Sequence, residues 1–106
     1  MSDTFAVTKE QETVKITLSG RLDATNAAAF QEEIKKIIGQ PVKNLVFLAG
    51  DLTYISSAGL RVIIFAKQKI GTGASVYLIG AQESVLNVIK MSGLDNFMHI
   101  QDTFEG

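Results

Sequence analysis

Two adjacent serines, Ser56 and Ser57, stand between an apolar segment and a run of residues with helical spacing. A serine at the start of a helix accepts a hydrogen bond from a free backbone N–H, which stabilises the helix by about 0.5–2 kcal/mol. A phosphoserine also fits such a position, because the first-turn amides of residues 58–60 and the positive end of the helix dipole face it. The pair therefore predicts a helix cap, and a phosphate on Ser57 would be tolerated there without unfolding the domain.

Gly59 falls inside the first turn of this expected helix. Glycine in a helix costs about 1 kcal/mol relative to alanine, so a glycine there needs a reason. The usual reason is that backbone or a binding partner approaches closely. We therefore expect backbone or a partner to approach closely at Gly59.

The remaining composition excludes several kinds of site. The chain has no cysteine, which rules out disulfides, zinc sites with thiolate ligands and thiol nucleophiles. Its one histidine, His99, cannot form a cluster of imidazole ligands. An enzyme with Ser57 as its nucleophile would need His99 as the base, and Ser57 is not in a G-x-S-x-G motif. We therefore expect no enzyme activity, metal or cofactor, and we expect His99 to be a structural or surface residue.

Charge and length point to one domain without nucleic-acid or membrane partners. The 106 residues carry ten Lys and Arg against eleven Asp and Glu, a formal net charge of -1. Binding to nucleic acid or anionic lipid needs a basic patch, which this balance does not favour. No secretion signal and no run of about 20 apolar residues is visible. We expect a cytoplasmic protein with a single domain over residues 1–106.

The elements that must position the serines alternate between strands and helices. In residues 13–19 the apolar Val14, Ile16 and Leu18 alternate with polar residues, as in a half-buried strand. Residues 45–49 form a continuous apolar run, which is typical of a central strand covered on both faces. We expect strands over 4–7, 13–19, 45–49, 75–79 and 97–100, polar connections over 9–12 and 50–56, and helices over about 26–38, 57–70 and 82–91.

This order predicts an α/β fold. Helices between successive strands imply a mixed, mostly parallel β-sheet with the helices packed on it, and the first two strands form an N-terminal β-hairpin. The helix that starts at Ser57 is apolar around most of its first half, so we expect it to be covered on more than one side.

Three motifs lie at the ends of these elements: Gly20-Arg21-Leu22-Asp23, the segment DLTYISSAGL over residues 51–60, and Met91-Ser92-Gly93-Leu94. Together with the order of elements, they resemble the STAS-domain anti-sigma factor antagonist family over essentially the whole chain. The second motif is similar to the phosphorylation loop of that family. In that loop the serine two places before the glycine is phosphorylated, and this position is Ser57.

The resemblance implies a partner switch. The unphosphorylated antagonist would bind an anti-sigma factor that is also a GHKL-type serine kinase, and so free a sigma factor. Phosphorylation of Ser57 would end that binding, and a PPM-type serine phosphatase would reset the system. The kinase would supply ATP and Mg²⁺, so Ser57 would be a substrate. The alternative is a STAS docking module in a transport or signalling assembly that does not act on a sigma factor.

The resemblance also implies a partner-binding surface around the switch serine, comprising Asp23, Tyr54, Ser56, Ser57, Ala58, Gly59 and Arg61. Simpler roles stay open for three of these residues. Asp23 is also suited to capping the first helix, alongside Thr25 or Asn26. Tyr54 is either a half-buried anchor of its loop or an exposed contact, and Arg61 is either solvated or a contact to the partner.

The sequence departs from the family pattern at three positions near the switch. Ser56 stands where many members have an acidic residue, Leu48 where many have Asp or Asn, and Ala58 where a hydroxyl residue is common. These differences change the polar surroundings of Ser57. Little chain follows Ile100, which leaves small room for the final amphipathic helix common in the family.

Overall fold

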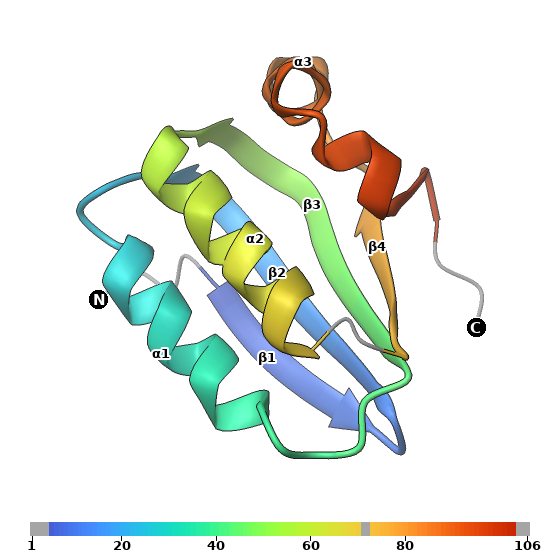
Figure 1. The fold of residues 1–106 in the computed structure, drawn as a ribbon. Coiled ribbons are helices and arrows are strands. Elements are labelled where there is room, and N and C mark those ends of the chain that lie inside the picture. The colour runs from blue at the N-terminus through green and yellow to red at the C-terminus, as the bar shows by residue number, and fades with distance from the viewer. Residues whose placement is uncertain (1–4, 71–72, 104–106) are drawn as a thin grey trace.

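A computed structural model describes residues 5–70 and 73–103, in which five strands form one sheet in the order β1-β2-β3-β4-β5 (Figure 1). The strands are β1 (Phe5–Glu10), β2 (Thr13–Leu22), β3 (Asn44–Ile55), β4 (Ser75–Ile79) and β5 (His99–Gln101). β1 pairs with β2 in antiparallel fashion, and the other neighbours are parallel. The predicted mixed sheet with its N-terminal hairpin is confirmed.

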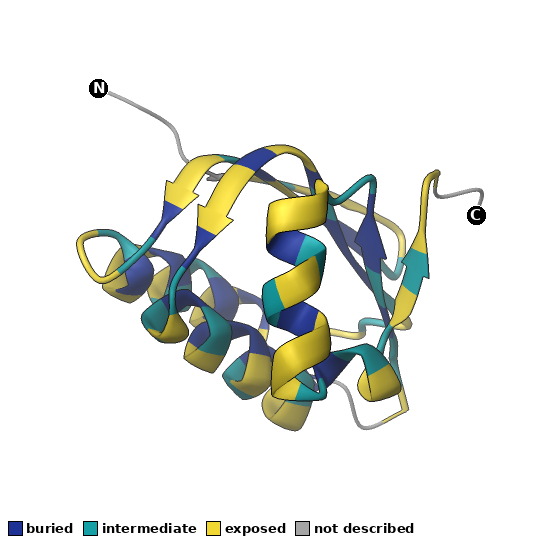
Figure 2. Ribbon diagram, turned by 90° about the horizontal axis from the view of Figure 1, so that it is seen from above, coloured by how far each residue is buried: buried dark blue, intermediate teal, exposed yellow. Residues whose placement is uncertain are grey.

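The helices of the described chain are α1 (Ala27–Ile37), α2 (Ser57–Ile70), α3 (Glu83–Ser92) and a short 3₁₀ helix, η1 (Leu94–Phe97). α1 and α2 lie side by side on one face of the sheet, as Figures 1 and 2 show from two directions. α3 lies against β3 and is followed at once by η1. Because each parallel strand is a neighbour of the next one along the chain, right-handed crossovers place α1 and α2 on the same face.

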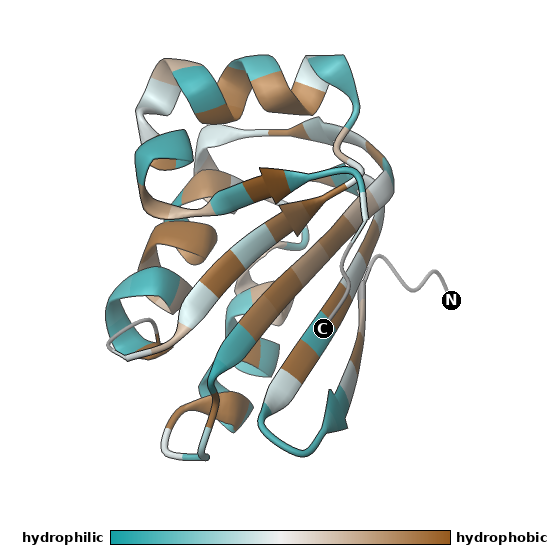
Figure 3. Cartoon of the chain, turned by 90° about the vertical axis from the view of Figure 1, so that its right-hand side faces the viewer, coloured by the Kyte–Doolittle hydropathy of each residue, from teal (hydrophilic) through white to brown (hydrophobic). Residues whose placement is uncertain are grey.

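The core lies between the sheet and these helices. Val14, Ile16 and Leu18 of β2 are fully buried, while Thr17 between them is exposed. On β3 the rings of Phe47 and of Phe30 from α1 meet edge to face, with centroids 6.1 Å apart. Apolar segments run along the strands of the sheet (Figure 3). β3 pairs with strands on both sides, which confirms the central position expected for residues 45–49.

The hairpin is longer than expected. The polar connection predicted over residues 9–12 is wrong, since β1 continues to Glu10 and only Gln11 and Glu12 form the turn. Lys9 and Glu10 are exposed, which an edge strand permits because one side of it faces solvent. Gln11 adopts a positive φ of 56° in this tight connection. Thr4, the expected first strand residue, lies outside the described residues.

β2 and β3 also extend further than the pattern indicated. The turn expected at residues 20–23 and the loop expected at 50–56 are mostly strand, with Arg21 paired to Tyr54 and Leu22 paired to Ile55. The pairing shifts register twice on the way, between Thr17 and Arg21. Such irregularities break the period of two, so the apolar residues of this stretch no longer alternate in sequence although they reach the core.

The helices follow the prediction with small shifts. α2 has the predicted bounds, and α3 begins one residue later than expected. α1 ends just before Gly39, which has φ 91°. The last strand was misplaced, because Phe97 belongs to η1 and β5 begins at His99. In the part of the chain that the structure describes, every helix is too short or too polar to cross a membrane.

Candidate functional site

The carboxyl ends of β2 and β3 bring the predicted switch residues to one rim of the sheet. The Ser56 N–H donates a 2.9 Å hydrogen bond to the Leu22 carbonyl, which ties the end of β2 to the start of α2. Asp23 and Ser57 are the next residues along their segments. In open α/β sheets, the carboxyl ends of the strands are where binding residues gather.

Ser56 and Ser57 make different contacts at the start of α2. The Ser56 carbonyl accepts a 2.9 Å bond from the Leu60 N–H, and its Oγ accepts a 3.4 Å bond from the Gly59 N–H. Ser56 is therefore the N-cap of α2, and Ser57 is the first helical residue. Ser57 is exposed, and its hydroxyl has no hydrogen-bond partner among the described residues. The Ser57 hydroxyl is thus open to chemistry from outside.

Gly59 is buried beneath this surface. A Cβ atom at Gly59 would lie 2.9 Å from Leu22 Cγ and 3.0 Å from Ile55 Cγ1, closer than carbon atoms pack. A close approach is present at this glycine, but the side chains of Leu22 and Ile55 make it, and not the backbone or partner that the sequence predicted. Gly59 therefore supports the exposed serine from below by letting α2 sit directly on the ends of β2 and β3.

Arg21 and Tyr54 form a stacked pair near the carboxyl ends of β2 and β3. The guanidinium carbon of Arg21 lies 4.2 Å from the centre of the Tyr54 ring, a cation–π geometry. Tyr54 is 40% exposed, so the ring is a surface residue with one face covered by Arg21. Sequence reasoning placed Arg21 in a motif but missed its role, because the pairing depends on the unforeseen extension of both strands.

The Asp23 carboxylate is fixed by the turn that follows β2. Its Oδ1 accepts bonds of 2.6 Å from the Thr25 hydroxyl and 3.0 Å from the Thr25 N–H. These two bonds, followed by the nearby positive charge of Arg21, hold the pKa of Asp23 below its usual value. Arg21 Nε lies 3.7 Å from Asp23 Oδ2. The carboxylate is therefore ionised and oriented at the rim.

Asn26 occupies the position before α1, so the capping role proposed for the Asp23 side chain is corrected. The Asn26 side chain faces back instead of capping the helix: its Oδ1 accepts from the Asp23 N–H at 2.9 Å, and its Nδ2 donates to the Arg21 carbonyl at 2.8 Å. Asp23 contributes to the start of α1 through its carbonyl, which accepts from the Ala27 N–H. The polar side chains here stabilise the turn between β2 and α1.

Side chains from distant segments hold the second half of β3 in place. The Thr53 hydroxyl donates to the Gly20 carbonyl at 2.9 Å, and the Ser84 hydroxyl donates to the Thr53 carbonyl at 3.1 Å. Gln82 adds a 2.9 Å bond from its amide to the Gly50 carbonyl. Sequence reasoning missed these supports, since nothing in the sequence indicates which distant carbonyls the start of α3 will meet.

The other residues that the sequence singled out lie on α2, β3 and β5. Ala58 is half-buried in the first turn of α2, and Arg61 is exposed one turn further and forms no ion pair within the described residues. Leu48 is half-buried on β3. His99 lies on β5, beyond β4, with its ring 4.8 Å from that of Tyr77. It is therefore not placed to act as a base for Ser57.

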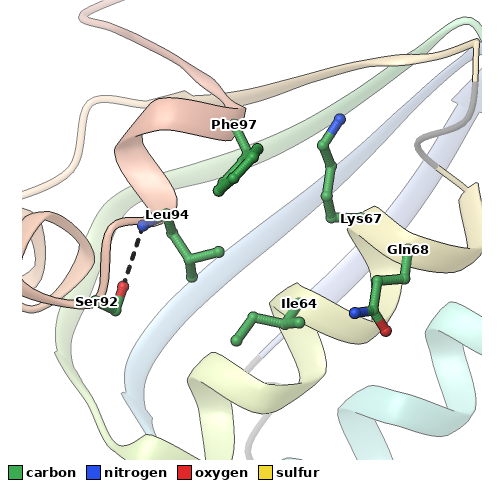
Figure 4. A pocket seen from close by; sticks show the side chains of 6 residues that line it. All are labelled: Ile64, Lys67, Gln68, Ser92, Leu94 and Phe97. Atoms are coloured by element: carbon green, nitrogen blue, oxygen red, sulfur yellow. Dashed lines mark hydrogen bonds between the residues drawn. The ribbon is translucent and has the colours of Figure 1, made fainter.

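A separate groove opens beside the C-terminal half of α2 (Figure 4). It encloses about 290 Å³. Its lining residues are Ile64, Lys67, Gln68, Ser92, Leu94 and Phe97. Phe97 is 61% exposed there. Ile64 lies seven residues beyond Ser57, about 10 Å along the helix axis, so the groove is not part of the serine site. No group of three potential metal ligands occurs among the described residues.

Comparison with known proteins places this geometry in a family. The anti-sigma-F factor antagonist RsfB of Mycobacterium tuberculosis is 22% identical over 102 residues, covering 96% of this chain and 84% of its own. The crystal structure of an anti-sigma factor antagonist from Mycobacterium paratuberculosis superposes with a TM-score of 0.85 at 20% identity, covering 95% of this chain and 86% of its own.

A third relative is the Bacillus cell fate determinant SpoIIAA in its phosphorylated form. Its structure matches with a TM-score of 0.73 at 22% identity over 91% of this chain and 89% of its own. At these identities the two structures show that the fold is shared. The STAS domain family model matches residues 4–106, nearly the whole sequence. The chain belongs to the STAS domain family, as its motifs and order of elements predicted.

Proposed function

We propose that this protein is an anti-sigma factor antagonist whose binding is switched by phosphorylation of Ser57. In the unphosphorylated state it binds an anti-sigma factor that is also a GHKL-type serine kinase. Phosphorylation of Ser57 by that kinase releases the antagonist, and a PPM-type phosphatase restores the hydroxyl. The partner-binding surface comprises the exposed residues Tyr54, Ser57 and Arg61 and the half-buried Asp23, supported by Ser56, Ala58 and Gly59.

The observation that supports this proposal most directly is that Ser56 caps α2 while the Ser57 hydroxyl stays exposed. Ser56 already uses its hydroxyl and carbonyl to cap α2. Ser57 is exposed at the first turn with its hydroxyl available. A kinase can reach the Ser57 hydroxyl without unfolding the helix, and the product phosphate is compatible with the helix start. Ser57 acts as a substrate, since His99 lies two strands away from β3 and no other imidazole exists in the chain.

The physical basis of release is the cost of burying the new charge. A phosphoserine carries about -1.5 to -2 charges and three strongly hydrated oxygens. Burying it at a protein interface costs free energy unless a cation from the partner meets it. The ionised Asp23 already contributes negative charge to this rim. A partner surface that fits the neutral Ser57 hydroxyl therefore does not fit phosphoserine at the same position.

Two relatives support the proposal by their names. RsfB is an antagonist of the anti-sigma-F factor, and SpoIIAA has been solved in a phosphorylated form. Both match this chain over more than nine tenths of its length. The shared fold supports carrying the role to this protein, while the position of Ser57 in the motif supports carrying the modification.

The test uses the GHKL-type serine kinase encoded nearest the gene of this protein. Incubation with ATP followed by site-localised mass spectrometry should find phosphate on Ser57, with Ser56 and Thr53 largely unmodified. By calorimetry, Ser57→Ala should bind the kinase in the presence of ATP as the parent does without it. Ser57→Asp should bind more weakly, and phosphorylated parent more weakly still.

Melting curves supply the control for these binding measurements. Aspartate is acceptable at the first turn of a helix, so Ser57→Asp should unfold at the temperature of the parent. Phosphate found mainly on Ser56, and persisting in Ser57→Ala, would defeat the assignment of the site. A phosphorylated parent that binds the kinase as tightly as the unmodified protein would defeat the switch and favour a docking module.

A further inference from the structure

We propose that Arg21 is the cation that pairs with a phosphoryl group on Ser57, moving from its place on Tyr54 and Asp23 to do so. The inference rests on the proposed function only in that Ser57 carries the phosphoryl group. It assigns a regulatory role to a residue outside the predicted partner-binding set, and it gives phosphorylation a second effect on the surface.

Arg21 is placed on the strand next to the segment that carries Ser57. Its Cα is paired with that of Tyr54, three residues before Ser57, and adjacent strands lie about 4.8 Å apart. One residue further, the Leu22 carbonyl accepts the hydrogen bond from the Ser56 N–H. The long side chain of Arg21 therefore starts from the rim where Ser57 begins α2.

The present contacts of Arg21 are easily exchanged. Its side chain is 63% exposed, and its closest approach to Asp23 is 3.7 Å, longer than a direct hydrogen bond. Exposed ion pairs of this kind contribute little to stability. Among the described residues, the guanidinium donates no hydrogen bond within 3.5 Å. Asp23 in turn keeps its two bonds from Thr25 when Arg21 leaves.

A phosphoryl group at Ser57 is a stronger partner for the Arg21 guanidinium than the Asp23 carboxylate is. Arginine donates through a planar fork that matches two phosphate oxygens at once, and charge-assisted bonds of this type are stronger than neutral ones. The phosphate also carries more charge than the Asp23 carboxylate. Leu22 and Ser56 are joined by a backbone hydrogen bond, and Asp23 and Ser57 are the residues that follow them. A phosphate on Ser57 would therefore lie near the Asp23 carboxylate. The positive charge of Arg21 on the phosphate offsets the repulsion between these two anions.

The movement has a consequence for Tyr54. Arg21 now covers one face of the ring. When the guanidinium leaves for the phosphate, that aromatic face becomes exposed. Phosphorylation thus changes both the charge at Ser57 and the shape of the neighbouring surface, so a partner that recognises the covered ring loses two contacts at once.

The experiment measures the second pKa of the phosphoserine by ³¹P NMR. Phosphoserine is placed at position 57 during synthesis of the full chain by an expanded genetic code, so no kinase is needed. A neighbouring cation favours the dianion and lowers this pKa. We expect Arg21→Gln to increase the proton affinity of the phosphate roughly threefold over the phosphorylated parent. Arg21→Lys should give an intermediate value, since the charge remains and the fork is lost.

The matched control is Lys69→Gln, which removes an exposed cation in the last turn of α2, far from Ser57, and should leave the phosphate pKa unchanged. Arg61 lies four residues after Ser57 on the same helix and is the competing cation, so Arg61→Gln is measured beside Arg21→Gln. The other charged side chains on the segments that meet here are Asp23, Asp51 and Glu83. These carboxylates stay in all variants. A phosphate pKa that is the same in Arg21→Gln and in the parent overturns the proposal, as does a larger shift in Arg61→Gln than in Arg21→Gln. Amide spectra of the variants verify that each one is folded.

A second readout follows the Tyr54 ring. Its proton shifts should move toward exposed values when phosphoserine replaces Ser57 in the parent, and should already have those values in Arg21→Gln. Ring shifts that do not respond to the phosphoserine overturn the displacement. The result is independent of the kinase: this proposal can fail while the kinase still modifies Ser57, and it can hold if no kinase does.

Discussion

The two ends of α2 both present residues to solvent, but they do so with different side chains and different support. At the N-terminal end the exposed residues are polar, and hydrogen bonds from Ser56, together with the contact at Gly59, fix the helix to β2 and β3. In the C-terminal half Ile64 is 36% exposed beside the groove under Phe97.

The difference teaches that exposure alone does not identify the functional end of a helix. The N-terminal end joins an available hydroxyl to a hydrogen-bonded base, which suits the modification that we propose for Ser57. The C-terminal half has exposed apolar area but lacks such fixed polar groups. Variants at matched positions along α2 can separate core support from surface function.

The largest difference in the free energy of unfolding should be between the alanine variants of two adjacent isoleucines, Ile63 and Ile64. Ile63 is 1% exposed and Ile64 is 36% exposed. Ile63→Ala should lower the free energy of unfolding by about 2–5 kcal/mol, because it leaves a cavity in the core. Ile64→Ala should cost less than about 1 kcal/mol, as surface substitutions do. Urea unfolding followed by circular dichroism measures both. Equal losses would mean that the groove side of α2 is as tightly packed as its core side.

Gly59→Ala should produce the next largest loss. The added Cβ would lie within 3.0 Å of carbon atoms of Leu22 and Ile55, and such overpacking costs about 1–3 kcal/mol. The better helix propensity of alanine returns about 1 kcal/mol, so the net loss should be about 0–2 kcal/mol. The control is Gly50→Ala, whose Cβ would meet only the Gly80 carbonyl oxygen at 4.0 Å. If both variants unfold at the same urea concentration, Gly59 does not support the rim.

The alanine variants of Ser56 and Ser57 should show a smaller difference in the free energy of unfolding. Ser56→Ala removes the side-chain cap of α2 and should lower the free energy of unfolding by about 0.5–1 kcal/mol, at the low end for a cap because its bond is 3.4 Å long. Ser57→Ala removes an exposed hydroxyl and should leave stability unchanged. Thermal unfolding of the two variants side by side provides the comparison. A greater loss in Ser57→Ala would reverse the roles assigned to the pair.

The smallest effect concerns the titration of Asp23. Its pKa is lowered chiefly by the Thr25 hydroxyl, so Thr25→Val should raise it toward the usual value near 4. Ionised Asp23 stabilises the folded chain above the pKa of the unfolded state, and this contribution is lost as the pH falls through the lower folded pKa. Thr25→Val should therefore reduce the acid-induced loss of stability. Carboxyl ¹³C NMR titration checks the pKa, with Thr53→Val as the control because its hydroxyl bonds a carbonyl.

Regular patterns allowed most of the fold to be predicted from sequence. The alternation in β2, the apolar run in β3 and the glycines after the helices gave the strand and helix order correctly. The missed parts are the extensions of β2 and β3, where register shifts disrupt the alternation. Propensity also placed the last strand too early, because the turn at Gly93 continues into η1 before β5 begins.

Only the part of the candidate site that lies in one short segment could be predicted from the sequence. The serines and Gly59 lie within four residues, and their sequence indicated the helix start and a close approach at Gly59, although not which groups make it. The pairing of Arg21 with Tyr54 and the bond from Ser84 to Thr53 join residues more than 30 positions apart. Such contacts depend on strand register, which local patterns do not specify when bulges occur.

The order of the strands has a consequence for how the chain is made. In the described sheet each strand lies beside the strands that precede and follow it in sequence, so no pairing waits for a segment made much later. The hairpin of β1 and β2 is available first, and each later strand adds to an edge already present as it leaves the ribosome. Tyr54, Ser56 and Ser57 emerge after β2 has been made. The rim that receives them is therefore ready before synthesis ends.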